Sequence, residues 1–178
     1  MTLPGVPPAE RPVPRVLVGA VMTVKSRTLE ELGRVVADEV RAAKLQLVRN
    51  VIVNGEAQFI QQLVSHVSND NEADAIVLVG GTGFGPRDST CEAIDSFVER
   101  RIEGFGDEFR HLLRVEMELG SHSWLCRATA GVYNQCLVFA MTGRASDIRR
   151  AMQTIVVPTL SDAVELATGR MRIVQLRT

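Results

Sequence analysis

The sequence predicts an α/β protein, a three-layer α/β/α sandwich built on a mostly parallel sheet. Three short, valine-rich apolar runs recur about 30 residues apart, and the segments between them place apolar residues at helical spacing. The runs are continuously apolar rather than alternating, which is typical of strands that are covered on both faces. A sheet between two layers of helices follows from these observations.

The first half of the chain is predicted to alternate strands and helices. Strands are expected over residues 16–24, 45–53 and 76–79, with helices around Leu32 and Leu63. Thr28, followed three residues later by Glu31, predicts a capping box at the start of the first helix. The remaining expected elements are a helix over 105–117, strands over 124–130 and 135–141, a helix over 146–167 interrupted or shifted near Pro158, and a short final strand over 172–176.

Composition indicates a single domain over residues 15–178. The chain has 178 residues, 46% of them hydrophobic and 23% charged, which suits one well-filled core. Residues 1–14 contain five prolines and are expected to form a flexible arm without the features of a secretion signal. The net charge is −1, with acidic and basic residues interspersed, so neither nucleic acid nor a membrane is expected as a partner.

Cysteine usage favours a reduced, cytoplasmic setting. Cys91, Cys126 and Cys136 are odd in number and lack C-x-x-C spacing, which argues against disulfides and against a thiolate metal site. We expect buried thiols and no tightly bound cofactor.

The most informative segment is the glycine loop, defined here as residues 80–88. It reads Gly80-Gly81-Thr82-Gly83-Phe84-Gly85-Pro86-Arg87-Asp88 and directly follows an apolar strand. Glycines permit positive φ and let bare N–H groups face a ligand, which is how loops hold phosphate. Ser89 and Glu92 predict a capping box, so the loop is expected to lead into a helix.

Two familiar phosphate-binding motifs do not fit this loop. Pro86 and Arg87 stand where a P-loop needs Lys and Ser or Thr, and Pro86 also takes the position of the third glycine of a dinucleotide fingerprint. The alternative interpretation is a tight turn without a ligand.

Several polar segments are expected at the same edge of the sheet. Ser26, Asn54, the glycine loop and Gly143-Arg144 each follow a predicted strand. Because ligands of open α/β sheets gather beyond the carboxyl ends of the strands, a binding crevice is expected there.

Four separated motifs occur in order along the chain: Gly80-Gly81-Thr82-Gly83, then Arg87-Asp88 with Thr90 and Glu92-Ala93, then Glu103-Gly104-Phe105-Gly106 with Phe109-Arg110, and Arg127-Ala128-x-Ala130-Gly131-Val132. Together they closely resemble the MoaB/Mog family of molybdenum cofactor biosynthesis proteins. The resemblance spans roughly residues 16–167. It implies a homotrimer or homohexamer that binds molybdopterin and, in active members, transfers AMP from Mg-ATP to the terminal phosphate of the pterin.

The resemblance assigns roles to individual residues. Asp88 matches the carboxylate that active members need for adenylyl transfer, where it would hold Mg²⁺ or orient the attacking group. Gly80, Gly81, Thr82 and Gly83 match the phosphate-cradling loop. Arg127 matches an arginine for which contact with substrate phosphate and contact with another subunit remain open alternatives.

The chain also departs from the family pattern. Active members carry a long first loop with Asp-x-Ser-Gly, which this chain lacks, and an aspartate where Asn54 stands. Two hypotheses follow: a molybdopterin adenylyltransferase in which Arg87 or Arg144 compensates electrostatically, or a member that binds pterin or nucleotide, or only its sister subunits, without turnover.

Overall fold

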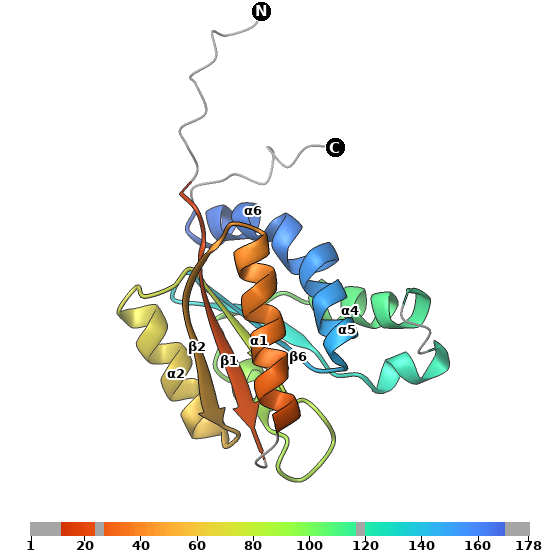
Figure 1. Ribbon diagram of the computed structural model, residues 1–178. Helices are drawn as coiled ribbons and strands as arrows, with labels where there is room; N and C mark the ends of the chain where they lie inside the picture. Colours follow the sequence, from red (N-terminus) through yellow and green to blue (C-terminus); the bar gives the residue numbers. More distant parts are fainter. Residues whose placement is uncertain (1–11, 24–26, 117–119, 170–178) are drawn as a thin grey trace, which may run out of the picture.

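The computed structural model describes residues 12–23, 27–116 and 120–169 (Figure 1). In chain order the elements are β1 (Arg15–Met22), α1 (Arg27–Ala42), β2 (Gln46–Asn54), α2 (Ala57–Asn69), β3 (Ala75–Val79), α3 (Thr90–Asp95), β4 (Arg100–Arg101), α4 (Gly104–Val115), η1 (Gly120–Leu125), β5 (Thr129–Tyr133), β6 (Cys136–Met141), α5 (Ala145–Ala151), η2 (Met152–Val156) and α6 (Val157–Ala167). Most of the predicted arm and the predicted strand over 172–176 lie outside the described residues.

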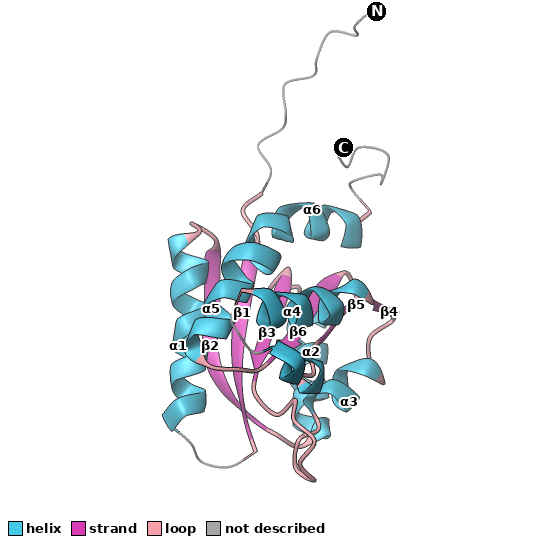
Figure 2. Cartoon of the chain, turned by 90° about the vertical axis from the view of Figure 1, so that its right-hand side faces the viewer, coloured by secondary structure: helices cyan, strands magenta, loops and turns pink. Residues whose placement is uncertain are grey.

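The strands form one mixed, mostly parallel sheet in the order β2-β1-β3-β6-β5-β4. Strands β2, β1, β3 and β6 run parallel to one another, and β5 is antiparallel to both β6 and β4. Figure 2 shows the strands running through the middle of the molecule with α6 across one end. The predicted α/β fold with a mostly parallel sheet is confirmed.

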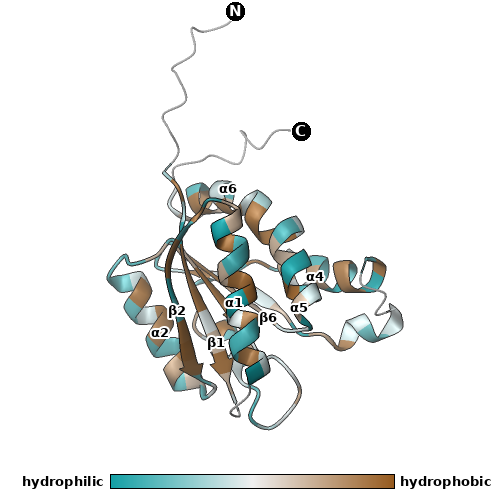
Figure 3. Ribbon diagram, viewed as in Figure 1, coloured by the Kyte–Doolittle hydropathy of each residue, from teal (hydrophilic) through white to brown (hydrophobic). Residues whose placement is uncertain are grey.

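Helices cover both faces of the sheet. On one face Val16, Val18 and Val77 pack with apolar residues of α1, α4, α5 and α6; on the other, Leu17 and Ile76 pack with α2 and α3. The central strands are accordingly apolar along their length, whereas α1 alternates between apolar and polar faces (Figure 3). Burial on both sides explains why the strand sequences do not alternate.

The strand predicted over residues 124–130 is misplaced. Residues Gly120–Leu125 form a 3-10 helix, and β5 begins only at Thr129. Inside β5, a Cβ on Gly131 would lie 2.8 Å from the Arg100 carbonyl oxygen, so this glycine permits the close approach of β4. The two-residue strand β4 was not predicted.

Both predicted capping boxes are wrong. Thr28 already lies inside α1. Ser89 does stand just before α3, but its hydroxyl makes no capping bond and donates instead to the Gly55 carbonyl, 2.6 Å away. The glycine loop does lead into a helix, the six-residue α3, which ends at Asp95.

The interrupted final helix is confirmed. A π-helical turn, η2, separates α5 from α6, and Pro158 occupies the first turn of α6. Proline has no N–H to donate, so the first turn of a helix, where no such bond is needed, accommodates it.

Candidate functional site

The four parallel strands end at one edge of the sheet. Met22 at the end of β1 pairs with Asn54 at the end of β2, and Val79 at the end of β3 pairs with Met141 at the end of β6. The arrowheads of β1 and β2 point to this lower edge in Figure 1. The predicted convergence of these strand ends is therefore present.

The glycine loop begins with two residues that only glycine accommodates easily. Gly80 and Gly81 have φ values of +102° and +65°. A Cβ on Gly80 would lie 2.7 Å from the Val21 carbonyl oxygen. The Gly80 N–H donates to the Met141 carbonyl at 3.1 Å, and the buried Thr90 hydroxyl donates to the Gly80 carbonyl at 2.9 Å. The start of the loop is thus fixed to β6 and α3.

Asp88 folds back into the loop. Its Oδ2 accepts a hydrogen bond from the Gly85 N–H at 3.1 Å, and its own N–H donates to the Gly85 carbonyl at 2.9 Å. A Cβ on Gly83 or Gly85 would lie 2.6 or 2.8 Å from Oδ2. These two glycines therefore make room for the carboxylate, which is half-buried among main-chain atoms.

The middle of the loop has unused hydrogen-bond donors. Within the described ranges, no hydrogen bond engages the N–H groups of Gly81, Thr82 or Gly83. The Thr82 side chain is 1% exposed, and its hydroxyl has no partner. Since buried polar groups are nearly always paired, this unmet capacity calls for an explanation.

Arg127 supports the loop from the segment before β5. Its Nη1 donates to the Gly83 carbonyl at 2.9 Å, and its Nη2 forms an ion pair with Glu92 of α3. The guanidinium carbon also lies 5.3 Å from the centre of the Phe84 ring. The family resemblance predicts contact of Arg127 with substrate phosphate or with another subunit, and in the structure Arg127 also makes these contacts within the chain.

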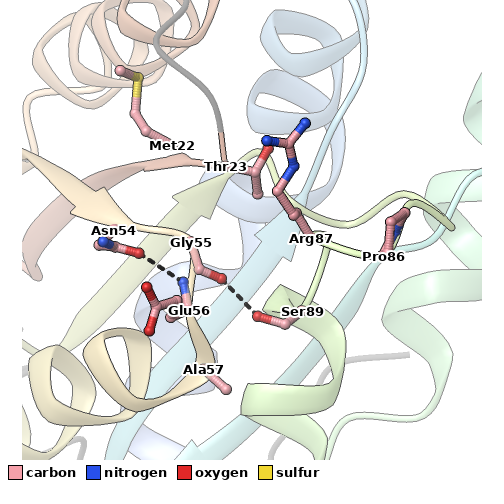
Figure 4. Close-up of a pocket in the computed structure, with 9 residues that line it drawn as sticks. All are labelled: Met22, Thr23, Asn54, Gly55, Glu56, Ala57, Pro86, Arg87 and Ser89. Carbon is pink, nitrogen blue, oxygen red and sulfur yellow. Dashed lines mark hydrogen bonds between the residues drawn. The ribbon is translucent and has the colours of Figure 1, made fainter.

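A pocket of about 480 Å³ opens beside the loop (Figure 4). Met22 and Thr23 after β1, residues 54–57 after β2, and Pro86, Arg87 and Ser89 line it. Asn54 and Arg87 were predicted site residues, whereas Thr23 and Glu56 were missed. Only their position after the strands could have indicated them.

Asn54 has a local structural task at the pocket wall. Its side-chain oxygen accepts a hydrogen bond from the Glu56 N–H at 2.9 Å, and the Gly55 N–H donates to the Met22 carbonyl at 3.1 Å. An aspartate could make the same turn, because only the acceptor oxygen is used.

Gly143 and Arg144 follow β6. Gly143 has φ +154°, and the Arg144 N–H donates to the buried carboxylate of Asp147 at 2.9 Å. The Arg144 guanidinium also bonds Asp147, which raises the pKa of Arg144, although 64% of its side chain is exposed. Of the remaining predicted site residues, Ser26 lies outside the described residues.

The donor set suits Mg²⁺ only together with a phosphate ligand. Nowhere in the described part of the chain do three His, Cys, Asp or Glu side chains gather to hold a metal ion. Mg²⁺ is commonly bound by one or two carboxylates plus substrate phosphates. Asp88 meets that requirement for a metal that arrives with its phosphate.

Comparison with known proteins identifies the family of this chain. The family model described as "Probable molybdopterin binding domain" matches residues 15–162. The chain belongs to the MoaB/Mog family. This MoaB/Mog-family chain is 33% identical over 147 residues to Molybdenum cofactor biosynthesis protein B of Bacillus subtilis strain 168, covering 81% of this chain and 86% of that protein.

Two further comparisons support the family. Molybdenum cofactor biosynthesis protein B of Escherichia coli K12 is 34% identical to this chain over 144 residues. The match covers 79% of this chain and 84% of the Escherichia coli protein. A crystal structure of Molybdenum cofactor biosynthesis protein B matches with a TM-score of 0.83 at 25% identity and covers 90% of this chain and 99% of that one.

Among helices of residues 12–23, 27–116 and 120–169, none is both long and apolar enough to cross a membrane.

Proposed function

We propose that this protein binds molybdopterin at the glycine loop and acts in molybdenum cofactor biosynthesis. The observation that carries the proposal is the set of unpartnered donors at Gly81, Thr82 and Gly83. A phosphate oxygen accepts several hydrogen bonds at once, and successive main-chain N–H groups in a turn suit such an anion. Membership of a family described by molybdopterin binding supplies the ligand.

Charge at the site supports the same assignment. Arg87 lines the pocket and is exposed, so it is available to neutralise a phosphate. Asp88 would repel a bare phosphate, but its Oδ2 is turned toward the Gly85 N–H. The main-chain donors of the loop are then left to the anion.

Transfer of AMP from Mg-ATP to the bound pterin is a second candidate, favoured by the position of Asp88. A carboxylate held beside a phosphate-binding loop suits Mg²⁺ that is carried by the nucleotide. An oxygen of the terminal phosphate of the pterin would attack the α-phosphorus of ATP, and the bond from that phosphorus to the β-phosphate oxygen would break and release pyrophosphate. The ion would withdraw electrons from the phosphate that is attacked. Asp88 would orient the ion, and the glycine loop would keep the terminal phosphate of the pterin in place.

The binding proposal is tested by anaerobic calorimetry with molybdopterin. Gly81→Ala should abolish binding, because the added methyl would clash with the Thr90 hydroxyl and alanine disfavours the φ of +65°. Gly104→Ala is the matched control, since a Cβ there meets no atom within 4 Å. No heat with the wild-type protein would refute the proposal.

The catalytic candidate has its own assay. Wild-type protein, molybdopterin, ATP and Mg²⁺ should yield adenylylated pterin by mass spectrometry, and Asp88→Asn should remove the product while keeping pterin binding. Binding without product would leave a binding protein.

Assembly and location complete the proposal. We expect a homotrimer or homohexamer that works in the cytoplasm. Light scattering that gives the 19.5 kDa mass of one chain would contradict the assembly.

A further inference from the structure

Phe84 is an exposed aromatic ring at the tip of the glycine loop. Its side chain is 69% exposed, although large apolar side chains are usually buried. The neighbours Gly83 and Gly85 have no side chains that could cover the ring. The ring is therefore accessible to a ligand that is bound at the unpartnered donors beside it.

One side of the ring is already occupied by a fixed cation. The Arg127 guanidinium lies over the Phe84 ring, with 5.3 Å between its carbon and the ring centre. The same guanidinium is held by the Gly83 carbonyl and by Glu92. The ring therefore has a fixed cation on one side, while 69% of the residue remains exposed and open to a ligand.

We propose that the open face of Phe84 stacks on the planar heteroaromatic ring of the ligand whose phosphate the glycine loop binds. This inference rests on the proposed function. Phe84 directly follows the unpartnered donors of residues 81–83, so one short segment offers both an anion site and an apolar ring. Stacking between an aromatic side chain and a heterocyclic base is worth about tenfold or more in affinity. A pterin phosphate and an adenine nucleotide share this chemistry.

The test compares Phe84→Leu with Phe84→Tyr by calorimetry. Leucine keeps apolar contact with the Arg127 side chain but has no π face, whereas tyrosine keeps the ring. The probes are molybdopterin, AMP and inorganic phosphate. We expect Phe84→Leu to weaken binding of at least one ring-bearing probe about tenfold, with phosphate affinity within about twofold of wild type. Phe84→Tyr should bind like wild type, and the probe that loses affinity identifies the ring.

Each other outcome overturns the inference. Unchanged affinity of Phe84→Leu for both ring-bearing probes would exclude stacking while leaving the proposed function intact. An equal loss for inorganic phosphate would show that Phe84 only shapes the loop. A smaller mass for Phe84→Leu in light scattering would assign the ring to a subunit contact. No binding of either ring-bearing probe by wild type would overturn the inference, and for molybdopterin the proposed function as well.

Discussion

Replacing Thr82 with valine should make the protein more stable and a weaker binder. Thr82 and Thr90 are both buried, at 1% and 0% exposure, but only the Thr90 hydroxyl has a hydrogen-bond partner. Burying an unpaired hydroxyl costs about 1–3 kcal/mol. Valine has nearly the same shape without that cost, so Thr82→Val should raise the free energy of unfolding by about 1 kcal/mol, or the melting temperature by about 2–4 °C.

Thr90→Val is the matched control for the same chemical change. It removes the bond of 2.9 Å to the Gly80 carbonyl and leaves that buried acceptor without the hydroxyl. The free energy of unfolding should fall by about 1–2 kcal/mol. Urea and thermal unfolding followed by circular dichroism measure both variants.

Measuring ligand binding by the same variants shows whether the Thr82 hydroxyl, which lowers stability, serves to bind the ligand. If the Thr82 hydroxyl is kept for the ligand, Thr82→Val should bind molybdopterin about tenfold more weakly despite its higher stability. A Thr82→Val protein as destabilised as Thr90→Val would refute the reasoning, because it would mean that the hydroxyl has a partner in the folded protein.

Three further predictions concern the support of the loop, the turn after β6 and a buried thiol. Arg127→Lys should lower the free energy of unfolding by less than about 1 kcal/mol, since the ion pair is partly exposed. It should nevertheless speed hydrogen exchange of the hydrogen-bonded Gly85 and Asp88 amides, measured by mass spectrometry, and unchanged exchange would contradict the role of Arg127. Asp147→Asn should lower the free energy of unfolding by about 2 kcal/mol, because the buried carboxylate accepts hydrogen bonds from both the main chain and the guanidinium of Arg144. Urea unfolding measures the change, and an unchanged free energy would contradict this role of Asp147. Burial raises the pKa of Cys136 from 9.0 to about 12, so the unfolded thiol ionises first and stability should fall above pH 9 by about 1.4 kcal/mol per pH unit. Cys136→Ala should show a shallower fall in urea unfolding across pH 9–11, and an identical slope would exclude this thiol as the cause.

The parallel half of the sheet could be predicted because each strand carries its own signal. Continuous apolar runs identified β1 and β3, and a Val-rich segment interrupted by Gln46, Arg49 and Asn50 identified β2. Glycine content identified the loop after β3. Strand β5 could not be located in the same way. It contains Gly131, which strands usually disfavour and which is needed here because β4 approaches closely at Arg100. The apolar pair Trp124-Leu125 also led to a predicted strand that begins too early, in residues that form a 3-10 helix.

For the candidate site, the sequence predicts where its residues lie in the fold but not which contacts they make. The sequence places Asn54, Arg87 and the glycine loop after strands that end at one edge. It does not show that the Ser89 hydroxyl turns to Gly55 rather than to its own helix, or that Arg127 reaches the Gly83 carbonyl across 44 residues. Both choices depend on which acceptors the tertiary fold brings near, and local propensity carries no information on that.

Two hydrogen bonds connect the ends of three strands: the Ser89 hydroxyl, after β3, donates to the Gly55 carbonyl, after β2, and the Gly55 N–H donates to the carbonyl of Met22 at the end of β1. Outward movement of the segment after β3 would break the first bond, and displacement of the turn after β2 would break the second. The segments that follow β1, β2 and β3 at this edge are consequently preorganised. Much of the conformational entropy lost in ordering them is lost during folding rather than on binding. A ligand that binds at this edge therefore meets a surface that needs little further ordering, which lowers the entropic cost of binding.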